Sequence, residues 1–80
     1  MERYIINRHI RQHLKIKGCE LAKRVEVSKQ TISNYERGVG GSRHLERVIE
    51  LELDLAIEKC DDELVKEFCE YLKLKRSGGV

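Results

Sequence analysis

The sequence of 80 residues has no proline and no tryptophan, and aromatic residues make up only 5% of it. It also lacks any apolar run near the ~20 residues that a membrane-spanning helix needs. Its first residues lack the long apolar stretch of a secretory signal peptide. A chain of this length forms one domain and buries too little surface to enclose a large catalytic cleft. These absences lead us to expect one small cytoplasmic domain that does not enter the membrane.

Cysteine and histidine are too few and too scattered to predict a metal centre or a redox pair. The three cysteines, Cys19, Cys60 and Cys69, show no CxxC spacing, so we expect reduced thiols. His9 and His13 stand four residues apart, a spacing that can hold a metal, but the sequence places no third ligand close to them. No nucleophile, base and acid occur together at a recognisable spacing. We therefore predict no metal, no cofactor and no enzymatic activity.

Positive charge is scarce in the second half of the chain. Residues 1–44 hold ten Lys and Arg against four acids, which gives +6, whereas residues 45–80 hold six against ten, which gives −4. The two values sum to the +2 of the whole chain. Such a division favours one surface that attracts a polyanion, such as nucleic acid, and another that does not.

The first half of the chain predicts three short helices. Residues 4–15 place apolar side chains at i, i+4 and i+8 on one helical stripe, and these are Ile6, Ile10 and Leu14. A second helix is expected over 18–25 and a third over 28–37. The hydroxyl of Ser28 is a suitable cap for the third helix, and Gly38 supplies its left-handed end.

The second half predicts a fourth helix, a short strand and a last helix. Ser42 is a suitable cap for the fourth helix. Apolar and acidic residues then alternate over 51–57, which predicts a short strand, although Leu and Glu form helices more readily than strands. Asp61 or Asp62 caps the last helix, which continues to about residue 74 in this interpretation. We expect a disordered tail at 77–80.

The stretch between Gly18 and Gly38 indicates a function. Its two helices are joined by a turn of a few residues, so they must cross steeply, and Ala22 is small enough for such a crossing. Ile32 and Tyr35 face inward and hold the second of these helices on the first. The opposite face carries hydrogen-bonding side chains, namely Lys29, Gln30, Ser33, Asn34 and Arg37. An α-helix fits the DNA major groove, where Gln and Asn can pair with adenine and Lys can reach guanine.

These residues resemble the Cro/phage-repressor (Xre-type) helix-turn-helix family over residues 5–53. The resemblance rests on Ile10-Arg11, Leu14, Leu21-Ala22, Val27-Ser28, Leu45, Val48-Ile49 and the run Thr31-Ile32-Ser33-Asn34-Tyr35-Glu36-Arg37-Gly38. It implies a mainly α fold, a compact lambda-repressor-like bundle of four or five helices, in a single domain over 1–76. It also implies sequence-specific binding of double-stranded DNA, usually as a dimer.

The resemblance assigns roles to individual residues. It places base-reading side chains at Lys29, Gln30, Ser33 and Asn34. It also implies an ion pair between Arg11 and Glu36 that ties the first helix to the third. Phosphate contacts are expected around the groove from Lys17, Lys23, Arg37 and Arg43, with Arg8 as a further candidate.

The sequence departs from the family pattern in two places. Lys17 and Gly18 stand where the family often has Ser or Thr followed by Gln, so the second helix loses a side-chain cap. Glu26 stands in the turn where the family usually has glycine. A left-handed conformation at a residue other than glycine costs about 1 kcal/mol, so we expect Glu26→Gly to leave stability equal or better.

The region after residue 50 is the expected site of protein–protein contacts. The candidates are Leu53 and Leu55 in the strand, or Leu64, Val65, Phe68 and Leu72 in the last helix, unless both segments only close the monomer's own core. Closed two-fold dimers are the commonest oligomers. We predict a bacterial or phage transcriptional regulator, a repressor, that binds a palindromic operator as a homodimer with residues 28–37 in the major groove. The alternative is the antitoxin of a toxin–antitoxin pair, which binds its toxin through residues 50–76.

Overall fold

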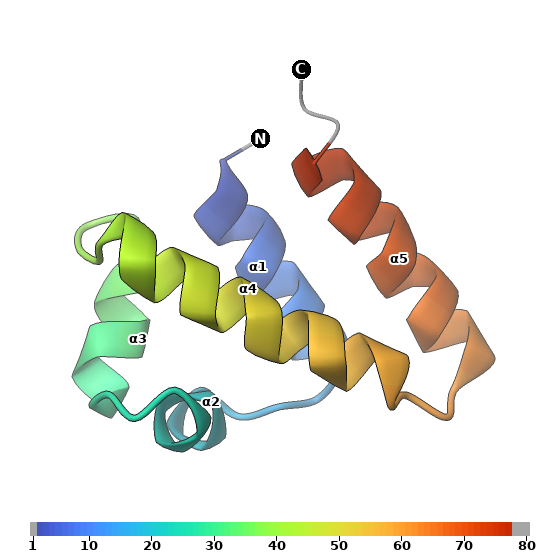
Figure 1. Ribbon diagram of the computed structural model, residues 1–80, viewed down its shortest axis with the longest axis horizontal. Helices are drawn as coiled ribbons and strands as arrows, with labels where there is room; N and C mark the ends of the chain where they lie inside the picture. The colour runs from blue at the N-terminus through green and yellow to red at the C-terminus, as the bar shows by residue number, and fades with distance from the viewer. Residues whose placement is uncertain (1, 78–80) are drawn as a thin grey trace.

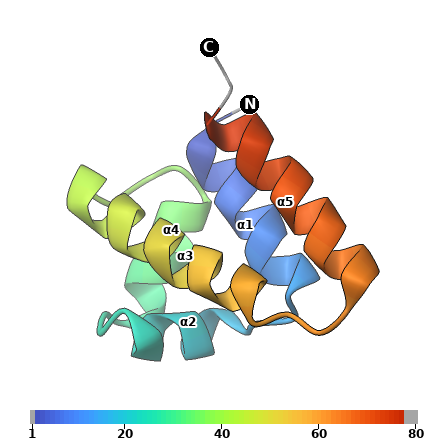
Figure 2. The ribbon, with the colours of Figure 1, turned by 45° about the vertical axis from the view of Figure 1, so that its right-hand side comes forward.

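The computed structural model describes residues 2–77, and within this range it contains five helices and no strand. The helices are α1 (Arg3–His13), α2 (Gly18–Arg24), α3 (Lys29–Glu36), α4 (Arg43–Glu58) and α5 (Glu63–Ser77). α1 and α4 cross in the middle of the bundle, with α3 on one side of them and α5 on the other (Figures 1 and 2). The predicted mainly α bundle is therefore confirmed.

Three helices begin at the side-chain caps that the sequence predicts. Oγ of Ser28 accepts a hydrogen bond of 3.1 Å from the backbone N–H of Thr31. Oγ of Ser42 accepts one of 3.1 Å from Leu45. Oδ1 of Asp62 accepts from two backbone N–H groups in the first turn of α5, at 3.0 and 3.2 Å. Each cap satisfies N–H groups that have no partner within their own helix.

Turns with left-handed backbone separate the first helices. Glu26, between α2 and α3, has φ 58°, which confirms the predicted left-handed turn without glycine. Lys15, after α1, has φ 60°, which the sequence did not indicate. Gly38 ends α3 with φ 76°, and a Cβ at this position would stand 2.5 Å from Cζ of Tyr4. Glycine is therefore favoured at position 38 by its left-handed conformation, and a larger residue there would also have to displace the ring of Tyr4.

The strand predicted over 51–57 is wrong, because these residues belong to α4. Ile49, Leu53 and Ile57 are fully buried at i, i+4 and i+8, whereas Leu51 and Leu55 are 55% and 50% exposed. The alternating pattern thus combined residues from two faces of one helix. The high helix propensity of Leu and Glu outweighs the alternating pattern. Within 2–77 there is also no strand with which this segment could pair.

A single apolar core joins the five helices. Ile10 of α1, Leu21 of α2, Ile32 of α3, Leu53 of α4 and Cys69 of α5 are each at most 1% exposed. Burial of an aliphatic side chain of this size contributes about 1.5–3 kcal/mol. The core therefore fixes the face that each helix turns toward solvent.

The last helix extends further than the sequence predicts. Ser77, the first residue of the expected disordered tail, is the last residue of α5. The rest of that tail, 78–80, lies outside the described residues. Among residues 2–77, no helix combines the length and the apolar character that crossing a membrane requires.

Candidate nucleic-acid interface

α2 and α3 form a compact unit around a short turn. The backbone N–H of Val27 donates to the carbonyl of Ala22 at 2.9 Å, so the turn folds back on the end of α2. Ala22 is 3% exposed and lies in the core with Leu21 and Ile32. The small side chain thus occupies the helix crossing where the sequence predicted it. Lys17, the N-cap residue before α2, makes no side-chain hydrogen bond to the helix, which agrees with the expected loss of that cap.

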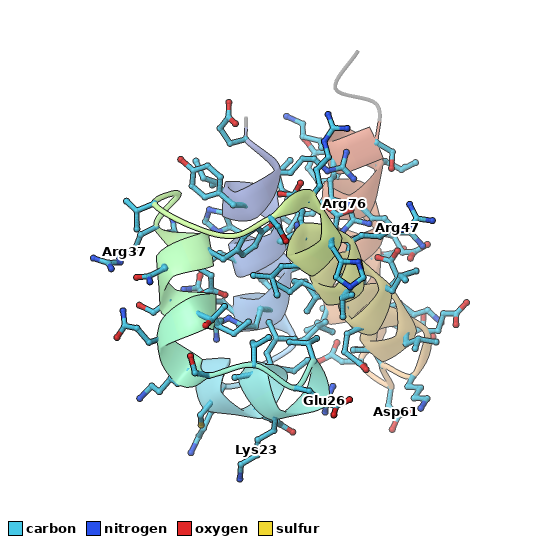
Figure 3. All side chains as sticks on the ribbon, turned by 60° about the vertical axis from the view of Figure 1, so that its left-hand side comes forward. Lys23, Glu26, Arg37, Arg47, Asp61 and Arg76 are labelled. Carbon is cyan, nitrogen blue, oxygen red and sulfur yellow. The ribbon has the colours of Figure 1, made fainter. Side chains whose placement is uncertain are left out.

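The outer face of α3 carries an ordered set of polar side chains. Lys29 and Gln30 are exposed, and Ser33 and Asn34 are half-buried. Oδ1 of Asn34 accepts hydrogen bonds from Nε2 of Gln30 at 2.9 Å and from an Nη of Arg37 at 2.8 Å. Arg37 points outward from this side of the bundle (Figure 3). The four predicted base-reading residues therefore lie together on one helix face.

The predicted phosphate-binding residues are all exposed on elements around α3. Lys17 precedes α2, Lys23 lies on α2, Arg37 follows α3 and Arg43 begins α4. Arg8 is half-buried and donates to the carbonyl of Glu36 at 3.4 Å. A hollow of about 320 Å³ opens beside α3. Its lining includes Arg8, Arg11, Gly18, Lys29 and Arg37.

The ion pair between Arg11 and Glu36 joins α1 to α3. Nε of Arg11 contacts Oε2 of Glu36 at 2.5 Å, and an Nη contacts Oε1 at 2.9 Å. The other Nη of Arg11 donates to the carbonyl of Ile16 at 2.7 Å. The two side chains are only 14% and 13% exposed. This geometry is the bidentate arrangement that gives arginine–carboxylate pairs their strength.

A second polar connection holds α3 from its inner face, and no local pattern in the sequence indicates it. The hydroxyl of Tyr35 donates to Oε2 of Glu46 at 2.7 Å and accepts from Nδ2 of Asn7 at 2.9 Å. Asn7 is 1% exposed and Tyr35 5%. Burial, and then the hydrogen bond to Glu46, raise the pKa of Tyr35 above its ordinary value. The phenol therefore stays neutral and keeps its donor hydrogen.

The same connection extends from Asn7 into α4 and α5. Nδ2 of Asn7 also donates to Oε2 of Glu50 at 2.9 Å, and its Oδ1 accepts from an Nη of Arg76 at 2.8 Å. Arg3 contacts both carboxylate oxygens of Glu50, at 2.9 and 2.6 Å. Burial alone would raise the pKa of Glu50, but the hydrogen bonds from Arg3 and Asn7 and the charge of Arg76 hold it below the ordinary value. In the sequence, neither Asn7 nor Arg76 stands out from its neighbours, because single polar residues and terminal arginines are common at protein surfaces. Their contact becomes visible only in the folded structure.

The residues proposed for protein contacts divide into buried and exposed sets. Leu53 and Leu72 are 0% and 7% exposed within the monomer, so they close its core and present no surface to a partner. Val65 is half-buried against the same core. Apolar residues that do reach the surface of α4 and α5 are Leu51, Leu55, Leu64, Phe68, Tyr71 and Leu74. The sequence reading did not include Leu51, Tyr71 and Leu74.

The cysteines and histidines are spread over the bundle. Cys19 is exposed, Cys60 half-buried and Cys69 buried. The ring of His13 packs on Phe68 with centroids 4.4 Å apart. In the part of the chain that is described, no group of three or more His, Cys, Asp and Glu side chains converges.

Comparison with known proteins agrees with this geometry. Residues 8–55 match a helix-turn-helix family model, and this range contains α2, α3 and parts of α1 and α4. No curated protein and no solved structure matches the chain. Because the matched range covers more than half of the 80 residues, the chain belongs to the Cro/repressor (Xre-type) helix-turn-helix family of DNA-binding transcription regulators.

Proposed function

We propose that the protein is a repressor that binds a palindromic operator in double-stranded DNA as a homodimer, with α3 in the major groove of each half-site. The observation that supports this most is the two-sided character of α3. Ile32 and Tyr35 bury one side of the helix, and the other side carries only side chains that can donate or accept hydrogen bonds. A helix of this kind has the shape and chemistry to read base edges.

Each polar residue of α3 has a specific part in the proposal. Gln30 and Asn34 suit adenine, which presents a donor and an acceptor to an amide side chain, and Lys29 suits guanine. Ser33 reads a base or contacts a phosphate. In the free protein Gln30 and Arg37 both donate to Asn34, so binding exchanges these bonds for bonds to DNA.

Lysine and arginine residues around α3 supply the contacts to the DNA backbone in this proposal. Lys17, Lys23, Arg37 and Arg43 of two subunits would neutralise about eight phosphates, so affinity should fall roughly 10³–10⁵-fold between 50 and 200 mM salt. Lys23→Gln should reduce the slope of log affinity against log salt by about two per dimer, one for each subunit. Lys59→Gln, which removes an exposed positive charge just after α4, is the matched control and should leave the slope unchanged. Binding that does not vary with salt would contradict the assignment to duplex DNA.

The outer face of α5 is the surface that we propose for the dimer. It presents apolar side chains at i, i+4 and i+7, namely Leu64, Phe68 and Tyr71, which are 78%, 41% and 51% exposed. α5 lies on the other side of the bundle from α3 (Figure 1), so pairing there leaves α3 accessible. Glu63 and Glu67 lie in its first half and Lys73 and Lys75 in its second. An antiparallel pair of α5 helices would therefore place opposite charges side by side.

Selection of binding sites from random duplex DNA tests the proposed function directly. We expect a palindrome with half-sites ~34 Å apart. Gln30→Ala and Asn34→Ala should each relax the preference at particular bases, by about 1–3 kcal/mol per lost bidentate contact. Gln12→Ala, which removes an exposed amide of α1, is the control and should leave the preference intact. The absence of a palindrome would refute the dimeric operator, and an unchanged preference in both α3 variants would refute α3 as the reading helix.

The exposed apolar face of α5 also supports a second candidate function. An antitoxin would use the same DNA-binding helices and would bind its toxin through residues 50–76. Sedimentation equilibrium separates the two candidates. A dimer at micromolar concentration that is lost in Phe68→Ser supports the repressor dimer, whereas a monomer that binds an apolar dye leaves this face for another protein.

A further inference from the structure

Arg76 lies in the last turn of α5, outside the residues 8–55 that match the family. Among the described charged residues outside that range, its side chain is the most deeply buried. Its side chain is 4% exposed. One Nη donates to Oδ1 of Asn7 at 2.8 Å, and the other lies 3.0 and 3.2 Å from the two carboxylate oxygens of Asp54. Its Nε lies 3.8 Å from Glu50 and has no hydrogen-bond partner among residues 2–77. A guanidinium withdrawn from water in this way costs free energy, so its position calls for a reason beyond packing.

The bond from Arg76 fixes which way the amide of Asn7 points. With Oδ1 accepting from Arg76, both hydrogens of Nδ2 are available for the hydroxyl of Tyr35 and for the carboxylate of Glu50, each at 2.9 Å. The opposite orientation would set Oδ1 against the carboxylate of Glu50 and Nδ2 against the guanidinium of Arg76. Arg76 thereby also determines the hydrogen bond that Asn7 gives to Tyr35.

Tyr35 transmits this orientation to the outer face of α3. It follows Asn34 directly in the sequence, and its ring is further fixed edge-on by Tyr4, with centroids 6.5 Å apart. Because α3 has only eight residues, a shift of Tyr35 moves Gln30 and Asn34 with it. Bidentate contacts to base edges tolerate little displacement, because hydrogen bonds weaken steeply with distance and angle.

We propose that Asn7 and Arg76 are positioning residues for DNA recognition, so that the docking of α5 sets the orientation in which α3 meets the bases. This inference rests on the proposed function. Neither residue touches DNA in the proposal, since both are at least 90% buried, and Figure 3 shows Arg76 well apart from the outer face where Arg37 lies. Both also lie outside the matched range 8–55. The hydrogen bonds that run from Arg76 through Asn7 to Tyr35, called the relay below, thus join two residues outside the matched range to one inside it.

A double-mutant cycle on operator binding tests the proposal. Arg76→Lys keeps the charge near Asp54, but one ammonium cannot reproduce the two-pronged contact with Asn7 and Asp54. We expect about fivefold to tenfold weaker binding to the selected operator, with binding to unrelated duplex DNA within about twofold of wild type. Tyr35→Phe should likewise weaken binding to the selected operator and not binding to unrelated DNA. The double variant should bind the operator no more weakly than the single variant with the lower affinity, because both changes break the same relay. Lys59→Gln, which removes an exposed positive charge just after α4, is the control.

Additive effects in the cycle, or an operator preference that Arg76→Lys leaves unchanged, would overturn the proposal. If Arg76→Lys does not fold, Asp54→Asn takes its place, because it loosens the grip on Arg76 without removing it. The same lack of additivity with Tyr35→Phe is then expected.

Amide hydrogen exchange in the free protein provides a readout that loss of stability alone would not produce. Arg76→Lys should speed exchange in α3 more than in α2, whereas simple destabilisation would speed both equally. A uniform increase would refute the relay. This measurement needs no DNA, so a wild-type protein that selects no duplex would refute the proposed function while exchange still decides whether α5 and α3 are coupled.

Discussion

Replacing Arg11 by alanine should destabilise the protein far more than replacing an arginine at its surface. The change removes two contacts to Glu36 and one hydrogen bond to the carbonyl of Ile16. It leaves the carboxylate of Glu36, which is 13% exposed, without its partner. Breaking a fully buried pair costs about 3–5 kcal/mol. Because a seventh of each side chain still reaches solvent and Arg8 lies close to Glu36, we expect a loss near the lower end, about 3 kcal/mol.

Thermal unfolding followed by circular dichroism measures this loss. For a domain of this size each kcal/mol shifts the melting temperature by about 4–8 °C, so Arg11→Ala should melt roughly 12–24 °C below wild type. Glu36→Ala should give a comparable decrease.

The chain contains a matched control for this measurement. Arg24 pairs with Glu20 at 3.1 Å on α2, but these side chains are 39% and 49% exposed. Arg24→Ala should therefore cost at most about 1 kcal/mol. If Arg11→Ala and Arg24→Ala melt at the same temperature, the reasoning from burial is wrong.

Three further predictions concern the turn, the polar core and the thiols. Glu26→Gly should raise the free energy of unfolding in urea by about 1 kcal/mol, because it relieves the left-handed φ of 58°; a clear decrease would show that the Glu26 side chain stabilises the turn. The pKa of Glu50 is lower in the folded protein than its ordinary value of 4.5. Its contribution to the free energy of unfolding is therefore complete above pH 4.5 and is lost as the pH falls through the lower pKa of the folded protein. In urea unfolding curves at a series of pH values, the free energy of unfolding of Glu50→Gln should fall less steeply with acid than that of the wild type. Identical pH profiles of the two proteins would contradict this. Burial raises the pKa of Cys69, so a thiol reagent at mildly alkaline pH should label Cys19 quickly and Cys69 only on unfolding; mass spectrometry that finds equal rates would exclude the buried position.

Much of the fold followed from local signals in the sequence. Ser28, Ser42 and Asp62 cap helices where expected, and Gly38 ends α3, because caps and glycine act on their immediate neighbours. The polar outer face of α3 was predictable for the same reason, since it needs only the helical period and the nature of the side chains. The Arg11–Glu36 pair spans 25 residues, and it was found through the family resemblance rather than through any local pattern.

The errors came from competing periods and from long-range contacts. Over 51–57, the exposed Leu51 and Leu55 alternate in sequence with the buried Leu53 and Ile57 of α4. A helix with apolar residues on two faces therefore has the alternating pattern that is typical of a strand. Asn7 and Arg76 were missed because neither is unusual in its own segment. Their contact joins residues 69 positions apart, and only the packing of α1 against α5 makes it visible.

That separation also affects how the protein is made. Asn7 leaves the ribosome 69 residues before Arg76, which at 5–20 residues per second is a delay of about 3–14 s. During this interval α1 to α4 can assemble only with the amide of Asn7 and the carboxylates of Glu50 and Asp54 still solvated, because burying them without the guanidinium is costly. The nascent helix-turn-helix should therefore stay loosely packed until α5 has been synthesised and can supply Arg76.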